Sequence, residues 1–139
     1  MPALSRWFIK TSFIYLFASL FAAFILAAQK VWELPDFILA LSPIYLHLFL
    51  VGWVTQFIFG IAIWMFPKFS SEKPHGNRTL GWATYVMLNL GLLLRLISEP
   101  LLPLRLKPWW GWFLAASAIL QWLAGLAFIA NIWGRVKRK

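Results

Sequence analysis

The chain contains no cysteine, only four acidic residues and only two histidines among its 139 residues. Without cysteine it can form neither a disulfide nor a thiolate metal site. The acids and histidines are too few and too scattered for a paired-carboxylate site or a nucleophile–base pair, and the sequence has no phosphate-binding loop. We therefore do not expect the chain to be an enzyme on its own.

Charged residues of every kind are scarce, at 12% of the chain, whereas 62% is hydrophobic. A soluble domain is typically about half apolar and about a quarter charged. A water-soluble fold of this size lacks the interior to hide so much apolar surface, so lipid must be the solvent for most of the chain. Tryptophans gather near the ends of the apolar runs, as in the aromatic belts of membrane proteins; these are Trp7, Trp32, Trp109, Trp110 and Trp133.

Four apolar runs are each long enough for a helix that crosses a bilayer, which needs roughly 20 residues. Short connections separate the runs, and short connections make consecutive helices antiparallel neighbours. No small-residue cleavage pattern follows the first run, so we expect it to be a retained helix. The sequence predicts an all-α membrane protein with one domain, residues 1–139, folded as an up-down four-transmembrane-helix bundle. The expected helices cover about residues 8–29, 37–67, 79–103 and 109–134.

The net charge of +9 would favour a nucleic-acid partner in a soluble protein, but here the basic residues lie in short connections and at the C-terminus. Orientation in the bilayer and anionic lipid explain them better, and we expect no nucleic-acid partner. Nine Lys and Arg lie at the termini and in the second connection, and three lie in the first and third connections. Because cytoplasmic segments are richer in Lys and Arg, we expect both termini on the cytoplasmic side of a bacterial or archaeal inner membrane. The nine are Arg6, Lys10, Lys68, Lys73, Arg78, Arg135, Lys137, Arg138 and Lys139, and the three are Lys30, Arg105 and Lys107.

Polar residues inside the predicted helices are candidates for function, because an unpaired polar group in hydrocarbon is costly. His47 lies in the outer half of helix two, and Arg95 lies near the outer end of the antiparallel helix three. Both are therefore expected at a similar depth, as a heme with an axial imidazole and an arginine at its propionates would need. The alternative is that Arg95 pairs with Glu99 one turn later, and that His47 hydrogen-bonds to a neighbouring helix. The full set is His47, Gln56, Asn89, Arg95, Glu99 and Gln121.

Helical spacing sorts several residues into faces. In helix three a stripe of mostly small and polar residues should face protein, and Gly91 within it leaves room for a flat ligand or for another backbone. Helix two has one face of small and polar residues, suited to close contact with another helix. Its opposite face is apolar and would pack against the macrocycle of a heme. The stripes are Gly81, Thr84, Leu88, Gly91, Arg95 and Glu99 in helix three; Gly52, Gln56 and Gly60 in helix two; and Ser117, Gln121 and Gly125 in helix four. The apolar face of helix two is His47, Leu50, Val51, Val54, Ile58, Ile61 and Met65.

The segment from His47 to Trp53, continued by Phe59–Pro67, resembles helix two of heme-copper oxidase main subunits, most closely in the nitric oxide reductase branch. In that family a histidine near the outer end ligates the low-spin heme, and a Phe-Gly, six further residues and a Pro end the helix inside. Phe59-Gly60 and Pro67 keep this spacing. The resemblance implies that His47 is an axial ligand of heme b, and it transfers no other site.

The same resemblance covers under a fifth of the chain, and the larger enzymes have many more helices and further histidines. Reduction of oxygen or nitric oxide at a binuclear centre is therefore not expected. No second axial ligand is evident, since Met87 lies nearer mid-membrane, Met65 lies near the inner end, and His75 lies in the second connection and is expected to face solvent. Either a second subunit contributes its own His47, or the iron stays open to a gas or to water.

We therefore expect a heme b-binding membrane protein that acts in electron transfer or in binding a diatomic gas. His47 would be the metal ligand, and Arg95 and Gly91 would contact the heme. We expect the protein to lie in the lipid bilayer as a homo-oligomer, either a dimer or a trimer, and to have a respiratory-chain partner. Two alternatives stay open: a heme-free structural or assembly subunit of a respiratory complex, and a small oligomeric transporter or channel with Gln56, Asn89 and Gln121 along its path.

Overall fold

The computed structural model describes residues 1–67, 76–101 and 109–136, and every regular element within these ranges is helical. Four spans among them are long and apolar enough to cross a membrane, with mean hydropathies between 1.5 and 2.1. Only 11 to 28% of the most apolar stretch of each span is buried, so apolar side chains also cover the outside of the bundle, where a soluble protein would place polar residues. The chain therefore has the character of a multi-pass membrane protein. The spans are Ala3–Gln29, Asp36–Met65, Arg78–Leu101 and Trp110–Arg135.

Helix α1 runs further than the sequence predicts, and the other spans begin and end within two residues of the predicted bounds where these are described. Helix α1 covers Ala3–Trp32, about one turn more at each end than residues 8–29, and ends where Glu33 adopts a left-handed φ of 48°. Helix α4 covers Arg78–Leu101 and carries Pro100 in its last turn. Helix α5 covers Trp110–Ile132 and continues into a 3₁₀ turn, η3, at Trp133–Arg135. The expected end of helix three at residue 103 lies outside the described residues.

The second span consists of four consecutive helical segments of different pitch. Its middle part, η2, is a π-helix in which the Thr55 hydroxyl donates to the Leu50 carbonyl oxygen five residues earlier, at 2.9 Å. A π stretch widens the turn and rotates everything beyond it relative to an ideal α-helix, and such stretches are frequent at functional sites. Phe66, before Pro67, is extended and ends the span, as predicted. The segments are η1 (Asp36–Ala40), α2 (Leu41–His47), η2 (Leu48–Thr55) and α3 (Gln56–Met65).

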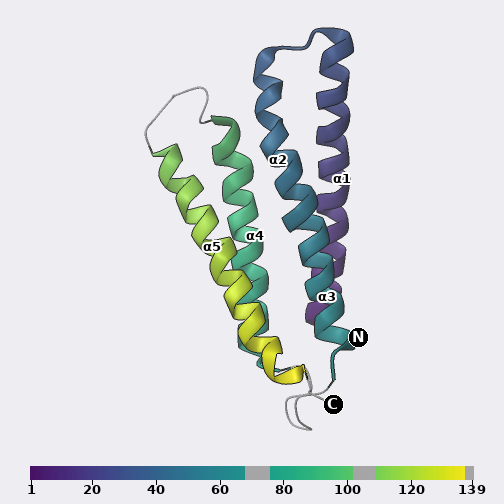
Figure 1. The fold of residues 1–139 in the computed structure, drawn as a ribbon, viewed down its shortest axis with the longest axis vertical. Coiled ribbons are helices and arrows are strands. Elements are labelled where there is room, and N and C mark those ends of the chain that lie inside the picture. The colour runs from purple at the N-terminus through teal and green to yellow at the C-terminus, as the bar shows by residue number, and fades with distance from the viewer. Residues whose placement is uncertain (68–75, 102–108, 137–139) are drawn as a thin grey trace.

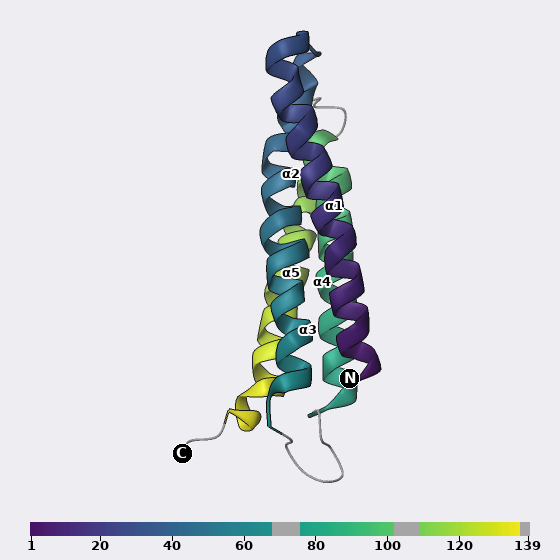
Figure 2. The ribbon, with the colours of Figure 1, turned by 90° about the vertical axis from the view of Figure 1, so that its right-hand side faces the viewer.

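The helices form two side-by-side pairs. Helix α1 packs along α2, η2 and α3, and α4 packs along α5 (Figure 1). Helix α4 provides most of the contact between the pairs, which lie one behind the other in Figure 2. Helix α5 comes close to the first pair toward its C-terminal end (Figure 1). There the rings of Phe59 and Phe128 stack with centroids 3.6 Å apart and planes 6° from parallel.

Buried apolar side chains form two clusters at different heights. The lower cluster, toward the N-terminal end of α1, joins α1, α3, α4 and α5; its buried members are Leu4, Phe8, Ile63, Leu88 and Ala124. The upper cluster joins α1, α2, η2 and α4; its buried members are Tyr15, Ile44, Leu48 and Leu92. Val51, in the π stretch, packs against both clusters and so ties them together.

Glycine allows the closest helix contacts, as the small-residue stripes predict. A Cβ atom at Gly52 would lie 2.8 Å from the Cβ of Tyr15, and one at Gly60 would lie 3.0 Å from the Cβ of Phe8, both on α1. The Ser5 hydroxyl of α1 also donates to the Gly60 carbonyl oxygen. The face of helix two that carries Gly52, Gln56 and Gly60 is therefore the seam with α1, and this prediction is confirmed.

Arg135 connects the C-terminal end of the α4–α5 pair to the end of α3 in the other pair. It is only 1% exposed, and its guanidinium donates to the carbonyl oxygens of Ile63, Phe66 and Pro67 at 3.0, 2.6 and 3.0 Å. These carbonyls close α3, where the backbone has no helical donor left for them and the helix dipole is negative. Arg135 thus caps one helix from the end of another.

Candidate functional site

His47 ends segment α2, at the point where α turns give way to π turns. Its Nδ1 atom lies 2.9 Å from the backbone carbonyl oxygen of Pro43, one turn earlier. A carbonyl oxygen can only accept, so Nδ1 donates, and in the neutral ring the lone pair is left on Nε2. Metal-bound histidines are commonly oriented through such a bond. The half-buried imidazole is therefore held in the tautomer that an axial ligand needs.

The height of His47 in the bundle follows from its two neighbours on the inner face. Ile44 and Leu48, on either side of it in sequence, pack with Leu92 of α4 in the upper cluster. Arg95 follows Leu92 by just under one turn of α4. The packing thus brings His47 and Arg95 to similar heights, although no direct contact joins them.

Arg95 is engaged within its own helix. Its Nε and one terminal nitrogen donate to the two carboxylate oxygens of Glu99, at 3.1 and 3.2 Å. The pair is partly buried, with side chains 20% and 12% exposed. This bidentate ion pair is the arrangement that the sequence offers as the alternative to a propionate contact. The pair uses two of the five N–H donors of the guanidinium, so a propionate would have to be met by the remaining donors or would compete with Glu99.

Gly91 lies in the seam between α4 and α5. Its carbonyl oxygen accepts a 2.6 Å hydrogen bond from the Ser117 hydroxyl, and a Cβ atom there would lie 2.9 Å from Cγ of Gln121. Of the two possibilities the sequence leaves open, close approach of another backbone is the one observed. A flat ligand has no room on this side of Gly91.

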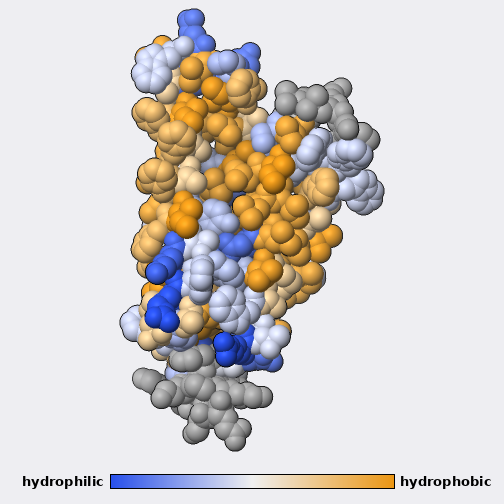
Figure 3. All heavy atoms as spheres, turned by 180° about the vertical axis from the view of Figure 1, so that it is seen from behind, coloured by the Kyte–Doolittle hydropathy of each residue, from blue (hydrophilic) through white to orange (hydrophobic). Residues whose placement is uncertain are grey.

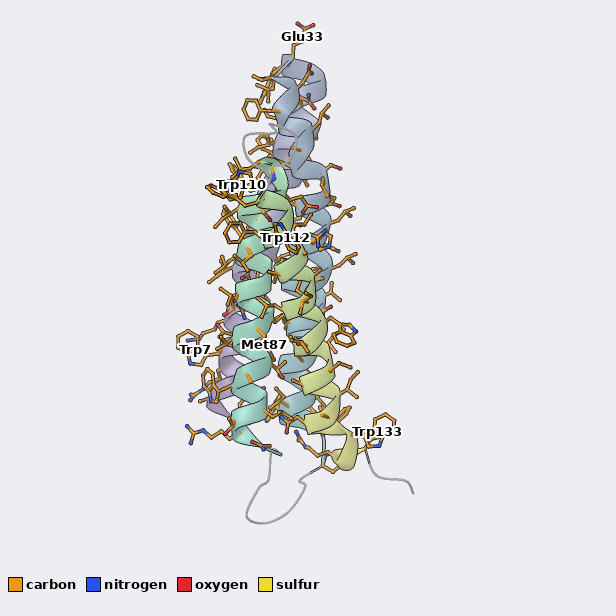
Figure 4. The ribbon with its side chains drawn as sticks, turned by 90° about the vertical axis from the view of Figure 1, so that its left-hand side faces the viewer. Trp7, Glu33, Met87, Trp110, Trp112 and Trp133 are labelled. Atoms are coloured by element: carbon orange, nitrogen blue, oxygen red, sulfur yellow. The ribbon has the colours of Figure 1, made fainter. Side chains whose placement is uncertain are left out.

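The methionines lie away from the level of His47. Met87 is midway along α4 (Figure 4) and packs against the lower cluster. Met65, at the end of α3, is 68% exposed. His75 lies outside the described residues. Within residues 1–67, 76–101 and 109–136 no three His, Cys, Asp or Glu side chains gather as a metal site would require.

The apolar face of helix two, expected to clothe a macrocycle, is divided by the π stretch. Leu50, Ile58 and Met65 are more than half exposed and point out of the bundle, whereas Val51 packs inward against both clusters. Val51 thus belongs to the packed interior, whereas the exposed members of this face are open to lipid or to a second chain. That the face surrounds a heme stays a prediction.

Sequence reasoning missed a polar network at the middle of the bundle. Asn89 accepts a 3.0 Å hydrogen bond from the Tyr15 hydroxyl and donates to Oε1 of Gln56 and to the Tyr85 carbonyl oxygen, both at 2.8 Å. Thr11 and Tyr85 share a further hydroxyl–hydroxyl bond of 2.7 Å. The fully buried Gln56 leaves its Nε2 without a partner among the described residues. The available signal was tyrosine inside predicted membrane helices, because a buried phenol needs a partner.

Gln121 does not belong to this network. Its Nε2 donates at 3.0 Å to the Ser117 hydroxyl, within the α4–α5 seam. Gln56 and Asn89 are joined between the first pair and α4 instead. The three amides therefore do not line one path. Gly125, grouped with Ser117 and Gln121 by spacing, has no atom within 4 Å of where its Cβ would be and makes no close contact among the described residues.

Several tryptophans lie toward the ends of the bundle. Trp133 points outward at one end and Trp110 and Trp112 lie toward the other, with Glu33 at the far tip of the first pair, whereas Trp7 points outward at about the height of Met87 (Figure 4). Amphipathic indole rings collect where hydrocarbon meets the headgroups. Their placement agrees with a bundle that crosses the bilayer along its long axis.

Comparisons with known protein families, with curated proteins and with solved structures found no match to this chain. The resemblance of helix two to heme-copper oxidase main subunits therefore stays a prediction. The class that the structure itself defines is an all-helical protein with four apolar spans of membrane-crossing length among the described residues.

Proposed function

We propose that the chain is a membrane-embedded heme b protein in which His47 supplies an axial ligand and the heme lies against the outward face of helix two. The observation that supports this best is the 2.9 Å bond from His47 Nδ1 to Pro43, which orients the ring and leaves Nε2 to bind iron. Heme in such a setting supplies electron transfer or the binding of a diatomic gas.

The surroundings of His47 fit the ligand role but not a complete pocket within one chain. Arg95 is paired with Glu99, and Gly91 is covered by α5. Leu50 and Ile58, on the same side of helix two, are more than half exposed. The proposal therefore includes a homo-oligomer, a dimer or trimer, in which a second chain covers the exposed face and a second His47 completes the coordination. A respiratory-chain partner would exchange the electron.

The spectroscopic prediction concerns His47 itself. Purified protein, supplied with hemin if needed, is expected to show a Soret band that is lost in His47→Ala and retained in the control His75→Ala. Sharp reduced bands indifferent to carbon monoxide indicate two protein ligands, and a carbon monoxide-sensitive spectrum indicates an open site. A colourless protein that takes up no hemin, or a Soret band unchanged in His47→Ala, contradicts the proposal.

The heme-free alternative, a structural or assembly subunit, also has an observation in its favour. Several polar side chains within the described spans pair with one another: Arg95 with Glu99, Tyr15 with Asn89, and Gln121 with Ser117. Nε2 of Gln56 has no such partner among the described residues. Such pairs serve to hold helices together. Loss of a partner complex on deletion of the chain, without any pigment in the pure protein, would favour this alternative.

We also propose that the bundle crosses an inner membrane in an up-down arrangement with both termini in the cytoplasm, on the strength of the nine-to-three excess of Lys and Arg. Since the chain has no cysteine, single introduced thiols report the topology cleanly. In intact cells a membrane-impermeant maleimide should label Asp36→Cys but not Thr79→Cys, both of which are exposed positions. After lysis both should react, whereas the opposite pattern in intact cells would show inverted orientation.

A further inference from the structure

We propose that the end of the bundle at which α1 and α4 begin binds the headgroups of anionic glycerophospholipids, through Arg6 and Lys10 in one recess and Arg78 in another. Together with Trp7 and Trp82, these three residues form the N-terminal basic site. The proposal does not depend on heme binding. It rests on two recesses, on an aromatic wall between them and on the distribution of charge.

The first recess lies on α1. It has a volume of about 210 Å³ and is lined by Ala3, Arg6, Trp7 and Lys10. Both cations are exposed, and one turn of helix separates them, so that they stand one above the other on the same face. Trp7 is 55% exposed and points away from the bundle (Figure 4), which places its ring where a glycerol backbone and acyl chains would lie.

The second recess is a wider, open hollow of about 530 Å³ at the start of α4, lined by Arg78, Thr79, Trp82, Ala83 and Val86. Thr79 and Ala83 are small, and Val86 gives the hollow an apolar upper wall. A cation at the helix end can bind the anionic headgroup of a phospholipid, and the apolar surface next to it can contact the acyl chains.

Tyr85 joins the two recesses. Its ring meets Trp7 edge-on at 6.5 Å and Trp82 edge-on at 5.8 Å, and its hydroxyl is held by Thr11 at 2.7 Å. Leu4 packs against α4 next to it, with Cδ2 only 2.6 Å from where a Cβ of Gly81 would be. The wall is therefore rigid, and the cations stand on both sides of it. Figure 3 shows hydrophilic surface gathered toward this end of the molecule, on either side of surface of intermediate hydropathy.

The positive charge of the N-terminal basic site is uncompensated among the described residues. The described carboxylates are those of Glu33 and Asp36, at the opposite tip, and of Glu99, which is paired with Arg95. Helices α1 and α4 both begin at this end and have no acidic residue in their first turns. Their dipoles therefore add positive potential where the three cations already stand. An anion bound here meets no repulsion from any described side chain.

A lipid is favoured over a free phosphate ion because the recesses lie on spans that contact the hydrocarbon. Each combines cations with exposed apolar surface, Trp7 in one and Val86 in the other, which inorganic phosphate would leave unused. Basic pockets at the ends of membrane helices bind anionic headgroups through this combination.

The test uses the full chain in a neutral detergent, where no charged bilayer surface adds non-specific attraction. Native mass spectrometry during titration with phosphatidylglycerol or phosphatidylcholine gives the affinity for each. The wild type is expected to bind phosphatidylglycerol in preference. The variant R6Q/K10Q/R78Q is expected to bind it on the order of 100-fold more weakly, from roughly fivefold per cation. All three side chains are exposed, and circular dichroism confirms that the variant is folded.

The matched control K137Q/R138Q/K139Q removes the same charge from the C-terminal tail and should change the affinity less than about threefold, because salt screens the attraction of charges that make no contact with the bound lipid. Equal binding of the two lipids by the wild type, or an equal loss in both triple variants, overturns the proposal. Millimolar inorganic phosphate added to the titration should not displace the lipid, and displacement would assign the site to a soluble phosphate instead.

Discussion

Arg135→Ala is expected to lower the free energy of unfolding by about 3 kcal/mol, a large effect for a single substitution. The side chain is buried and makes three hydrogen bonds from a charged donor, each to a carbonyl that terminates α3. Removing it leaves those carbonyls without a donor and removes the cation that faces the negative end of the helix. Water at the end of the bundle restores part of the loss.

Arg135→Lys separates charge from geometry. A lysine keeps the positive charge but cannot place several donors in the planar fork that reaches Ile63, Phe66 and Pro67 together. We expect it to recover less than half of the lost stability. Arg6→Ala is the control, since Arg6 is exposed and its replacement removes the same charge. Unfolding in detergent with increasing dodecyl sulfate, followed by tryptophan fluorescence, gives the three free energies. Equal stability of Arg135→Ala and Arg6→Ala would contradict the capping role.

The positions of the spans could be predicted because length and hydropathy suffice for them. The end of the second span at Pro67 also follows from local chemistry, since proline has no amide donor and disfavours a helical residue before it. The π stretch could not be predicted. Residues 48–55 are almost uniformly apolar, so the sequence carries no periodic signal that would reveal one wider turn.

The roles of single polar residues depend on tertiary contacts that a sequence does not state. Arg135 counts equally with the other basic residues in an orientation rule, yet among the basic residues that the structure describes it is the one buried against α3. Two of the partners of Asn89, Tyr15 and Gln56, come from α1 and from the second span, more than thirty residues away in sequence. By contrast, the bonds from His47 to Pro43 and from Arg95 to Glu99 span four residues of one helix, and spacing alone could suggest them.

Polar side chains hold this bundle together at separate heights. Arg135 fastens α5 to α3 at one end, Asn89 joins α4 to the first pair at mid-height, and Ser117 fastens α5 to α4 at Gly91. In lipid the apolar surfaces gain little by meeting one another, so close packing at small residues and hydrogen bonds between helices decide which helices pair. The α4–α5 seam depends most directly on close packing at small residues and on hydrogen bonds between helices. Of the four spans, α5 has the smallest fraction of buried residues.

Gly91→Leu is therefore expected to destabilise the bundle by about 3 kcal/mol, at the upper end for overpacking. Its Cβ would lie 2.9 Å from Cγ of Gln121 and 3.0 Å from the backbone oxygen of Ser117, and a backbone oxygen cannot turn aside as a side chain can. Helix α5 would have to move away, and the 2.6 Å bond from Ser117 to the Gly91 carbonyl would be lost with it. The same dodecyl sulfate titration measures the effect.

Gly125→Leu is the matched control, because it adds the same side chain to α5 where nothing lies within 4 Å; its stability should stay within about 0.5 kcal/mol of the wild type. Because α5 covers Gly91 and leaves no room there for a flat ligand, Gly91→Leu should lose the same stability with and without hemin. A larger loss in the hemin-loaded protein would contradict this and place the heme at Gly91. Unchanged stability in Gly91→Leu would show that the α4–α5 seam is not closed at this residue.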